Sequence, residues 1–175
     1  DIQKELDRIT VSDAEGEGIM KTLVKARSMY NAVSQYVDEL IKLKRQEIQK
    51  LTSEIMLAIT NKPEEYAGVY VQEDYTLQVY RHDDSVVDNE RLSAGEKEVL
   101  AYSFITALNL SSSNPAPFIM DTPFGHLDSG HRQGLLDSLP RLGVQVFLLA
   151  TDRDLPSDER DRIQGSITQE FILDR

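Results

Sequence analysis

Apolar residues along the first third of the chain recur at intervals of three and four residues. The series begins at Ile19 and continues at Leu23, Ala26, Tyr30, Val33 and Val37, then after a phase slip at Ile41, Lys44, Ile48, Leu51, Ile55 and Ile59. This spacing predicts a coiled-coil helix of about forty residues. Residues 2–9 show the same spacing, but residues 12–18 carry two glycines and no apolar stripe, which predicts a helix break or loop. Because Pro63 ends the helix, residues 1–62 are predicted to form a coiled-coil segment with a break near residues 12–18.

The pattern changes to alternation after Pro63. Apolar and polar residues alternate on both sides of a polar turn at Glu73 and Asp74, which predicts a β-hairpin over residues 68–81. A helix then begins at Ser93, and residues 111–117 have the composition of a turn.

Short apolar segments alternate with a helical segment over the last third of the chain. Residues 118–121 and 144–150 are predicted to be buried strands, with a helix over about residues 129–139 between them. Residues 167–173 are predicted to be a third strand. Strands that alternate with helices imply a largely parallel sheet, so residues 63–175 are predicted to form an α/β domain.

Composition narrows the class of protein. The chain has 175 residues, 40% of them apolar and 28% charged, which is typical of a soluble globular domain. It has no cysteine, so thiol redox chemistry and thiolate metal sites are excluded. No signal peptide or membrane-spanning run is evident, and we expect a cytoplasmic protein, nucleoid-associated if bacterial, of which this chain is a piece.

The net charge of -11 means that any contact with nucleic acid must be local. The one basic strip, residues 42–50, carries four cations that could bind DNA phosphates, although a solvated coiled-coil face is the favoured interpretation. His126 and His131 could suggest a metal pair, but no third zinc ligand accompanies them, and surface or interface roles are favoured.

Two features carry candidate chemistry. Ser93 and Glu96 form a capping box at the start of a helix, and Gly95 between them keeps the backbone bare where a ligand could approach. A helix cap alone would also account for this pair without any ligand. Three acids, Asp121, Asp128 and Asp152, follow strands or tight turns and are expected to converge on the carboxyl edge of the sheet. Hard carboxylate ligands of this kind suit Mg²⁺ held together with a phosphate.

The order of these motifs resembles the C-terminal half of an ATP-binding-cassette (ABC) ATPase head of the SMC type. LSAGEKE (residues 92–98) is similar to the signature motif, PFIMD (117–121) to the Walker B strand, GHLD (125–128) to the D-loop, and LLATD (148–152) to the following strand and switch loop. The upstream coiled coil and hairpin also match the layout of such heads. Within them the motifs look most like the DndD branch, the ATPases of DNA phosphorothioate (sulfur) modification, with the ATPase of the double-strand-break repair nuclease complex as a near neighbour.

The resemblance implies that two engaged heads hold ATP between them. It assigns contacts with the nucleotide of the opposite head to the signature motif and the D-loop, through Ser93, Ala94, Gly95, Glu96 and Asp128. It assigns Mg²⁺ to Asp121. The implied partners are the N-terminal half of the same ATPase, a second copy of the head in a homodimer, DNA, and other DNA-modification or nuclease subunits. No membrane is implied.

The chain departs from the family pattern at three places. Thr122 and Asp152 stand where a catalytic glutamate and a switch histidine are usual, so either Asp152 or Asp128 takes over the attacking water, or hydrolysis is slow. The phosphate-binding loop G-x-x-x-x-G-K-[ST] is absent from the 175 residues, which makes this half of a head that we expect to be inactive alone.

Two functions remain open at this point. One is an ATP hydrolase whose cycle drives head engagement in DNA phosphorothioation or related DNA processing. The other is a nucleotide-gated coiled-coil scaffold that tethers DNA and partner proteins with little hydrolysis. The ATPase of a break-repair nuclease complex is a further candidate for the pathway.

Overall fold

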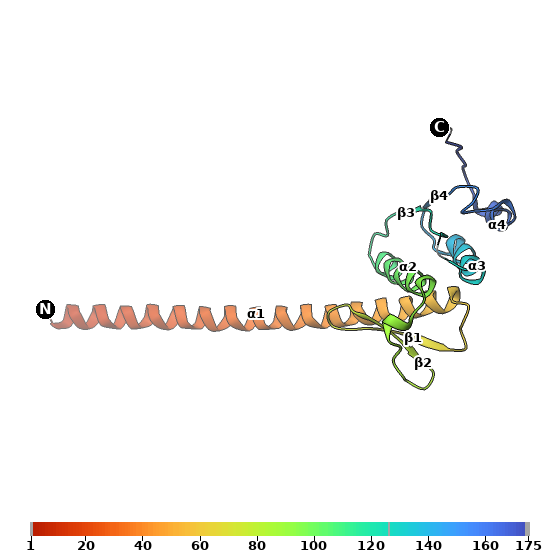
Figure 1. The fold of residues 1–175 in the computed structure, drawn as a ribbon. Coiled ribbons are helices and arrows are strands. Elements are labelled where there is room, and N and C mark those ends of the chain that lie inside the picture. The colour runs from red at the N-terminus through yellow and green to blue at the C-terminus, as the bar shows by residue number, and fades with distance from the viewer. Residues whose placement is uncertain (1, 126, 174–175) are drawn as a thin grey trace. The chain divides into compact units, whose positions relative to one another are not determined.

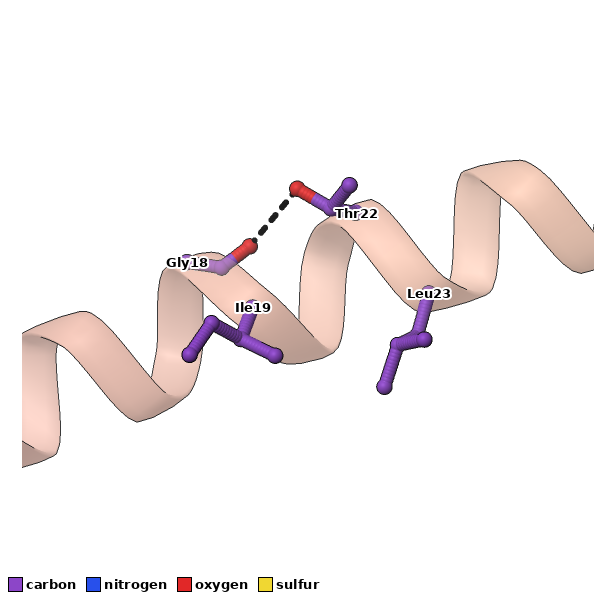
Figure 2. A pocket seen from close by; sticks show the side chains of 4 residues that line it. All are labelled: Gly18, Ile19, Thr22 and Leu23. Atoms are coloured by element: carbon purple, nitrogen blue, oxygen red, sulfur yellow. Dashed lines mark hydrogen bonds between the residues drawn. The ribbon is translucent and has the colours of Figure 1, made fainter.

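A computed structural model describes residues 2–125 and 127–173, and it begins with one long helix, α1 (Ile2–Ile59). The helix continues through residues 12–18, so the predicted break is wrong. Each glycine costs a helix only about 1 kcal/mol relative to alanine, which a helix of this length tolerates. Local contacts also connect the end of this segment to the next turn of the helix. Lys21 pairs with Glu17 at 3.0 Å, and the Thr22 hydroxyl donates to the Gly18 carbonyl at 3.0 Å (Figure 2).

Contacts divide the chain into two units, Asp1–Leu43 and Lys44–Arg175. The division falls within α1, because the last turns of α1 belong to the core of the second unit. Met56 and Ile59 are each 1% exposed. In the first unit the apolar seam from Ile19 onward is exposed. None of the helices in the described ranges combines the length and the apolarity needed to cross a membrane.

The predicted hairpin is confirmed. Strands β1 (Tyr66–Val71) and β2 (Leu77–Arg81) pair antiparallel, with Val69 opposite Val79. Both valines are fully buried. The hairpin lies along the last turns of α1 (Figure 1). There the Ser53 hydroxyl accepts from the Val69 amide at 2.9 Å.

The helices of the second unit complete the core. A short 3₁₀ turn (Asn89–Arg91) precedes α2 (Ala94–Leu110), and α3 (Ser129–Ser138) runs into a second 3₁₀ turn (Leu139–Arg141). Helix α3 approaches the end of α1 so closely that a Cβ on Gly134 would lie 2.4 Å from the Ile59 carbonyl oxygen. Only glycine permits this backbone contact. The buried core includes Val69, Val79, Val99, Phe124, Leu135 and Leu136.

The last part of the chain holds a two-stranded parallel sheet of β3 (Phe118–Asp121) and β4 (Val146–Leu149), followed by α4 (Ser157–Ile163) and a 3₁₀ turn (Gln164–Ser166). Two of the predicted strands are thus present, but they are half-buried and not fully buried as expected: Ile119 is 74% exposed. The third predicted strand is wrong, since residues 167–173 form no strand. In the described part of the chain that segment is not paired with any strand, and strand structure requires pairing.

Candidate nucleotide site

The predicted capping box at the start of α2 is confirmed. The Ser93 hydroxyl accepts from the Glu96 amide at 3.2 Å, and the Glu96 carboxylate accepts from the Ser93 amide at 2.8 Å. Ser93 and Ala94 are exposed, whereas Gly95 and Glu96 are buried. The helix tip therefore presents a serine, an alanine and the positive end of a helix dipole to solvent, an arrangement that favours anions.

Glu96 is held by the chain itself. Its second carboxylate oxygen accepts from Lys62 Nζ and from the Tyr66 hydroxyl, each at 2.8 Å. Burial alone would raise the pKa of Glu96, but hydrogen bonds from Lys62, Ser93 and Tyr66 outweigh it and hold this pKa at about 2. The same contact raises the pKa of Lys62, while burial and then the hydrogen bond to Glu96 raise that of Tyr66. Glu96 is thus a buried anion that braces the helix start, and its expected contact with nucleotide stays a prediction.

Asp128 caps α3. One of its oxygens accepts from the amides of Gly130 and His131, at 2.9 and 3.0 Å. The other lies 2.8 Å from His131 Nδ1 and 3.2 Å from Asn61 Nδ2. The His131 amide contributes most to holding the pKa of Asp128 below its ordinary value. Asp128 is therefore an anion whose two oxygens are both committed to positioning the D-loop.

The end of β3 is the most strained point of the site. Asp121 is exposed at the last position of the strand, opposite Leu149 of β4. Thr122 follows with φ of 45°, a left-handed conformation that is an outlier for a β-branched residue. Its amide donates to the Leu149 carbonyl at 2.8 Å, which holds the backbone in this conformation. Strain of this kind is concentrated at functional sites in proteins.

The three-acid cluster that the sequence predicted is not formed. The parallel pairing places Asp121 and the segment leading to Asp152 at the same edge of the sheet, and both carboxylates belong to exposed residues. Asp128 instead faces Asn61 and His131. Within residues 2–125 and 127–173, no three acidic or histidine side chains are grouped closely enough to hold a metal ion. The assignment of Mg²⁺ to Asp121 therefore stays a prediction.

His131 and the cations of the basic strip make contacts within the chain. His126 lies outside the described residues, and His131 is 2% exposed against Asp128. Each cation of the basic strip contacts an acid: the pairs are Lys42–Glu39, Lys44–Glu47, Arg45–Glu73 and Lys50–Glu54. Charges already paired attract DNA phosphates less, which supports the solvated-face interpretation.

Three positioning residues were missed by sequence reasoning. Asn61 and Lys62 contact Asp128 and Glu96, as described above. Arg132 donates to the carbonyls of Phe124 and Asp154, at 3.4 and 3.3 Å, and so joins the residue before the D-loop to the loop after β4. No local motif marks these residues, because their partners are distant in sequence.

Comparison with known proteins agrees with the motifs. The chain is 36% identical over 89 residues to the DNA replication and repair protein RecF of Rhizobium rhizogenes, covering 48% of this chain and 24% of RecF. It is 28% identical over 135 residues to the DNA double-strand break repair Rad50 ATPase of Halobacterium salinarum, covering 70% of this chain and 15% of that protein. No protein-family profile matches the chain.

A solved structure from work on ATP-driven dimerization and DNA-stimulated activation of SMC ATPases superimposes with a TM-score of 0.53. It is 15% identical and covers 77% of this chain and 98% of that one. The chain has the fold of an SMC-type ABC ATPase head. The predicted fold class, the C-terminal lobe of such a head, is thereby confirmed. The matched relatives are RecF and Rad50 proteins, and the resemblance to the DndD branch stays a prediction. This head segment spans about a quarter of the length of the RecF protein it matches.

Proposed function

We propose that this chain is the C-terminal half of an ATPase head that binds and hydrolyses ATP between two engaged heads. The observation that carries the proposal is the start of α2, where the Ser93–Glu96 capping box leaves the first helical turn exposed to solvent. The helix dipole there favours the binding of an anion, and Gly95 is the buried residue that follows the exposed Ser93 and Ala94. The phosphate-binding loop would come from the N-terminal half, since the sequence contains none.

Ser93, Ala94 and Gly95 would contact the γ-phosphate of the nucleotide bound by the second head. The Ser93 hydroxyl accepts its hydrogen bond from Glu96, which leaves its own proton free to donate to a phosphate oxygen. Glu96 would stabilise the helix cap and not contact the phosphate, because its carboxylate already accepts three hydrogen bonds within the chain.

Asp121 fits Mg²⁺ as one ligand among waters and phosphate oxygens, since Mg²⁺ commonly takes only one or two protein carboxylates. Within the described ranges no hydrogen bond or ion pair occupies the exposed Asp121 carboxylate. When bound, the ion would neutralise charge on the transferring phosphate.

Asp152 is the better candidate for orienting the attacking water. Asp128 has both oxygens engaged by four donors and a lowered pKa, which makes it a poor proton acceptor. Asp152 is exposed in the loop that follows β4. Thr122 has no basic group, so hydrolysis by this apparatus would be slow.

The N-terminal half of the ATPase would cover the open surfaces of this chain. A two-stranded parallel sheet with one apolar side chain 74% exposed is incomplete, because parallel sheets are normally buried on both faces. The exposed seam of α1, part of which Figure 2 shows at Ile19 and Leu23, would pack against the antiparallel helix of the same coiled coil.

The pathway would be DNA maintenance or processing. The matched relatives are named as DNA replication and repair proteins, and the motifs resemble the DndD branch of DNA phosphorothioation. DNA and the subunits that modify or cut it would be the partners, and a cytoplasmic location follows from this role. The alternative, a nucleotide-gated scaffold with little hydrolysis, is favoured by Thr122 and Asp152 in place of the usual catalytic pair.

The test is to produce the full-length protein with both halves of the head and to measure ATP-dependent dimerization and phosphate release, with and without DNA. Ser93→Arg should abolish dimerization because it blocks the helix tip, and Asp121→Ala should abolish phosphate release. Ser112→Arg, at an exposed serine in the turn after α2, is the matched control and should leave both unchanged. Dimerization without phosphate release in the wild type would favour the scaffold, and dimerization by Ser93→Arg would overturn the proposed site.

A further inference from the structure

The turn that follows α1 sends two neighbouring side chains to two different parts of the candidate site. Asn61 Nδ2 lies 3.2 Å from Asp128 Oδ2 at the start of α3, and Lys62 Nζ lies 2.8 Å from Glu96 Oε1 in the first turn of α2. Because Asn61 and Lys62 are consecutive, one point of the backbone is tied to the D-loop and to the signature helix together.

That point of the backbone is itself anchored to the last turn of α1. The Thr60 amide donates to the Met56 carbonyl at 2.8 Å, and the Lys62 amide donates to the Thr60 hydroxyl at 3.2 Å. Thr60 is 8% exposed. The side chains of Asn61 and Lys62 thus extend from a short, internally bonded turn and not from a free loop.

The backbone of α3 lies close to the end of α1 and to the turn that follows it. A Cβ at Gly134 would meet the carbonyl oxygen of Ile59 at 2.4 Å, and one at Gly130 would meet Asn61 Cβ at 3.0 Å. Close-packed contacts of this kind transmit displacement, since neither backbone can yield by rearranging a side chain. A shift of the last turn of α1 would therefore displace the start of α3 as well.

The Lys62–Glu96 contact and the Asn61–Asp128 contact differ in charge and burial. Lys62 joins a carboxylate that is 5% exposed, so its loss would leave a desolvated anion with fewer donors. Asn61 joins Asp128, whose side chain is 56% exposed and which retains His131 and two backbone amides as donors. The signature helix should consequently depend on Lys62 more than the D-loop depends on Asn61.

We propose that Asn61 and Lys62 are positioning residues that couple α1 to both nucleotide-facing motifs, so that ATP held by the signature helix and D-loop alters the last turns of α1. The inference rests on the proposed function, because it requires ATP to be bound at an engaged pair of heads. The coupling is assigned to the dipeptide Asn61–Lys62 and to the carboxylates of Asp128 and Glu96.

Hydrogen–deuterium exchange on the full-length protein tests the coupling. In the wild type, ATP should slow amide exchange in residues 44–59 of α1 by about tenfold, which corresponds to a coupling free energy of typical size between two sites. In the Asn61→Ala/Lys62→Met double variant, measured at an ATP concentration that saturates that variant, exchange in residues 44–59 should change less than about twofold. Lys62→Arg keeps the cation and should restore most of the response at that site.

Matched controls are Asn114→Ala, in an exposed loop, and Lys50→Met, a lysine of α1 whose pair with Glu54 lies on the surface at 3.8 Å. Both should respond to ATP as the wild type does. If ATP slows exchange in the double variant as much as in the wild type, the coupling is wrong but the proposed function stands. The same conclusion follows if the wild type binds ATP and exchange in α1 does not change. Failure of the wild type to bind ATP would instead reject the proposed function. If the double variant does not fold, the Lys62→Met single variant is measured in the same way, with the same two outcomes.

Discussion

Two small sheets of the second unit have opposite environments. In the hairpin of β1 and β2, the paired residues Val69 and Val79 are fully buried. In the parallel pair of β3 and β4, Ile119 is 74% and Phe147 48% exposed although the two residues are paired in register. Both sheets have two strands, so strand number does not explain the difference.

The difference lies in what the chain supplies to cover each sheet. The hairpin packs on the last turns of α1, where the Ser53 hydroxyl and the Gln49 side chain accept from its backbone amides. The parallel pair lacks further strands within the described ranges, although its side chains are as apolar as those of a buried sheet. One sheet is thus completed within this chain, and the other has the composition of a sheet that another polypeptide segment completes.

Introducing a charge into each sheet should give the largest difference in stability between the two. Val79→Asp would bury an unpaired carboxylate in the hairpin and lower the free energy of unfolding by about 4 kcal/mol. The matched Ile119→Asp should change it by less than about 0.5 kcal/mol in this chain, because the side chain is already in solvent. Urea unfolding followed by circular dichroism measures both. Equal losses at the two positions would contradict the comparison, whereas weakened binding of the N-terminal half by Ile119→Asp alone would sharpen it.

Adding a methyl group at the close contact between α3 and α1 should have the next largest effect. In Gly134→Ala the new methyl group would lie 2.4 Å from the Ile59 carbonyl oxygen, and relieving that overlap should cost about 3 kcal/mol. Gly165→Ala is the control, since a Cβ there meets nothing within 4 Å. Thermal unfolding of the two variants gives the measurement, and an unchanged Gly134→Ala variant would show that this packing is looser than the structure indicates.

Acid should lower the free energy of unfolding by protonating Glu96, which braces the start of α2. The pKa of Glu96 falls from an ordinary value of 4.5 to about 2 on folding, so its contribution to stability is present above pH 4.5 and is lost as the pH falls toward 2. The loss should be on the order of 2 kcal/mol. Denaturant unfolding between pH 5 and pH 2 should show a steeper decline in the wild type than in Glu96→Gln. Parallel declines would mean that other carboxylates dominate the acid response.

The smallest effect on stability should come from Asp121 at the edge of the open sheet. Asp121→Asn removes an exposed charge and should shift the free energy of unfolding by less than about 0.5 kcal/mol. In the full-length protein the same variant should lose phosphate release. Calorimetry and a phosphate assay on one preparation test both, and a large loss of stability would show that Asp121 has a structural role.

Local patterns were sufficient for several elements and for part of the site. The three-and-four spacing indicated α1, alternation indicated the hairpin, and the Ser93–Glu96 spacing indicated the capping box, because each depends on residues close together in the chain. The same local reasoning failed at residues 12–18, where two glycines did not outweigh the propagation of a long helix.

Sequence alone determined the identity and order of the motifs, from the cap at Ser93 to Asp121 at the end of an apolar strand. Only the tertiary structure decided what those residues contact. It committed Asp128 to Asn61 and His131 and not to the other acids, and it placed Lys62 against Glu96. Such contacts join positions that are distant along the chain, so their geometry depends on how α1, α2 and α3 pack and not on any local pattern. Apolarity predicted that residues 167–173 would be a strand, but a strand needs a partner, and pairing is a property of the assembled fold.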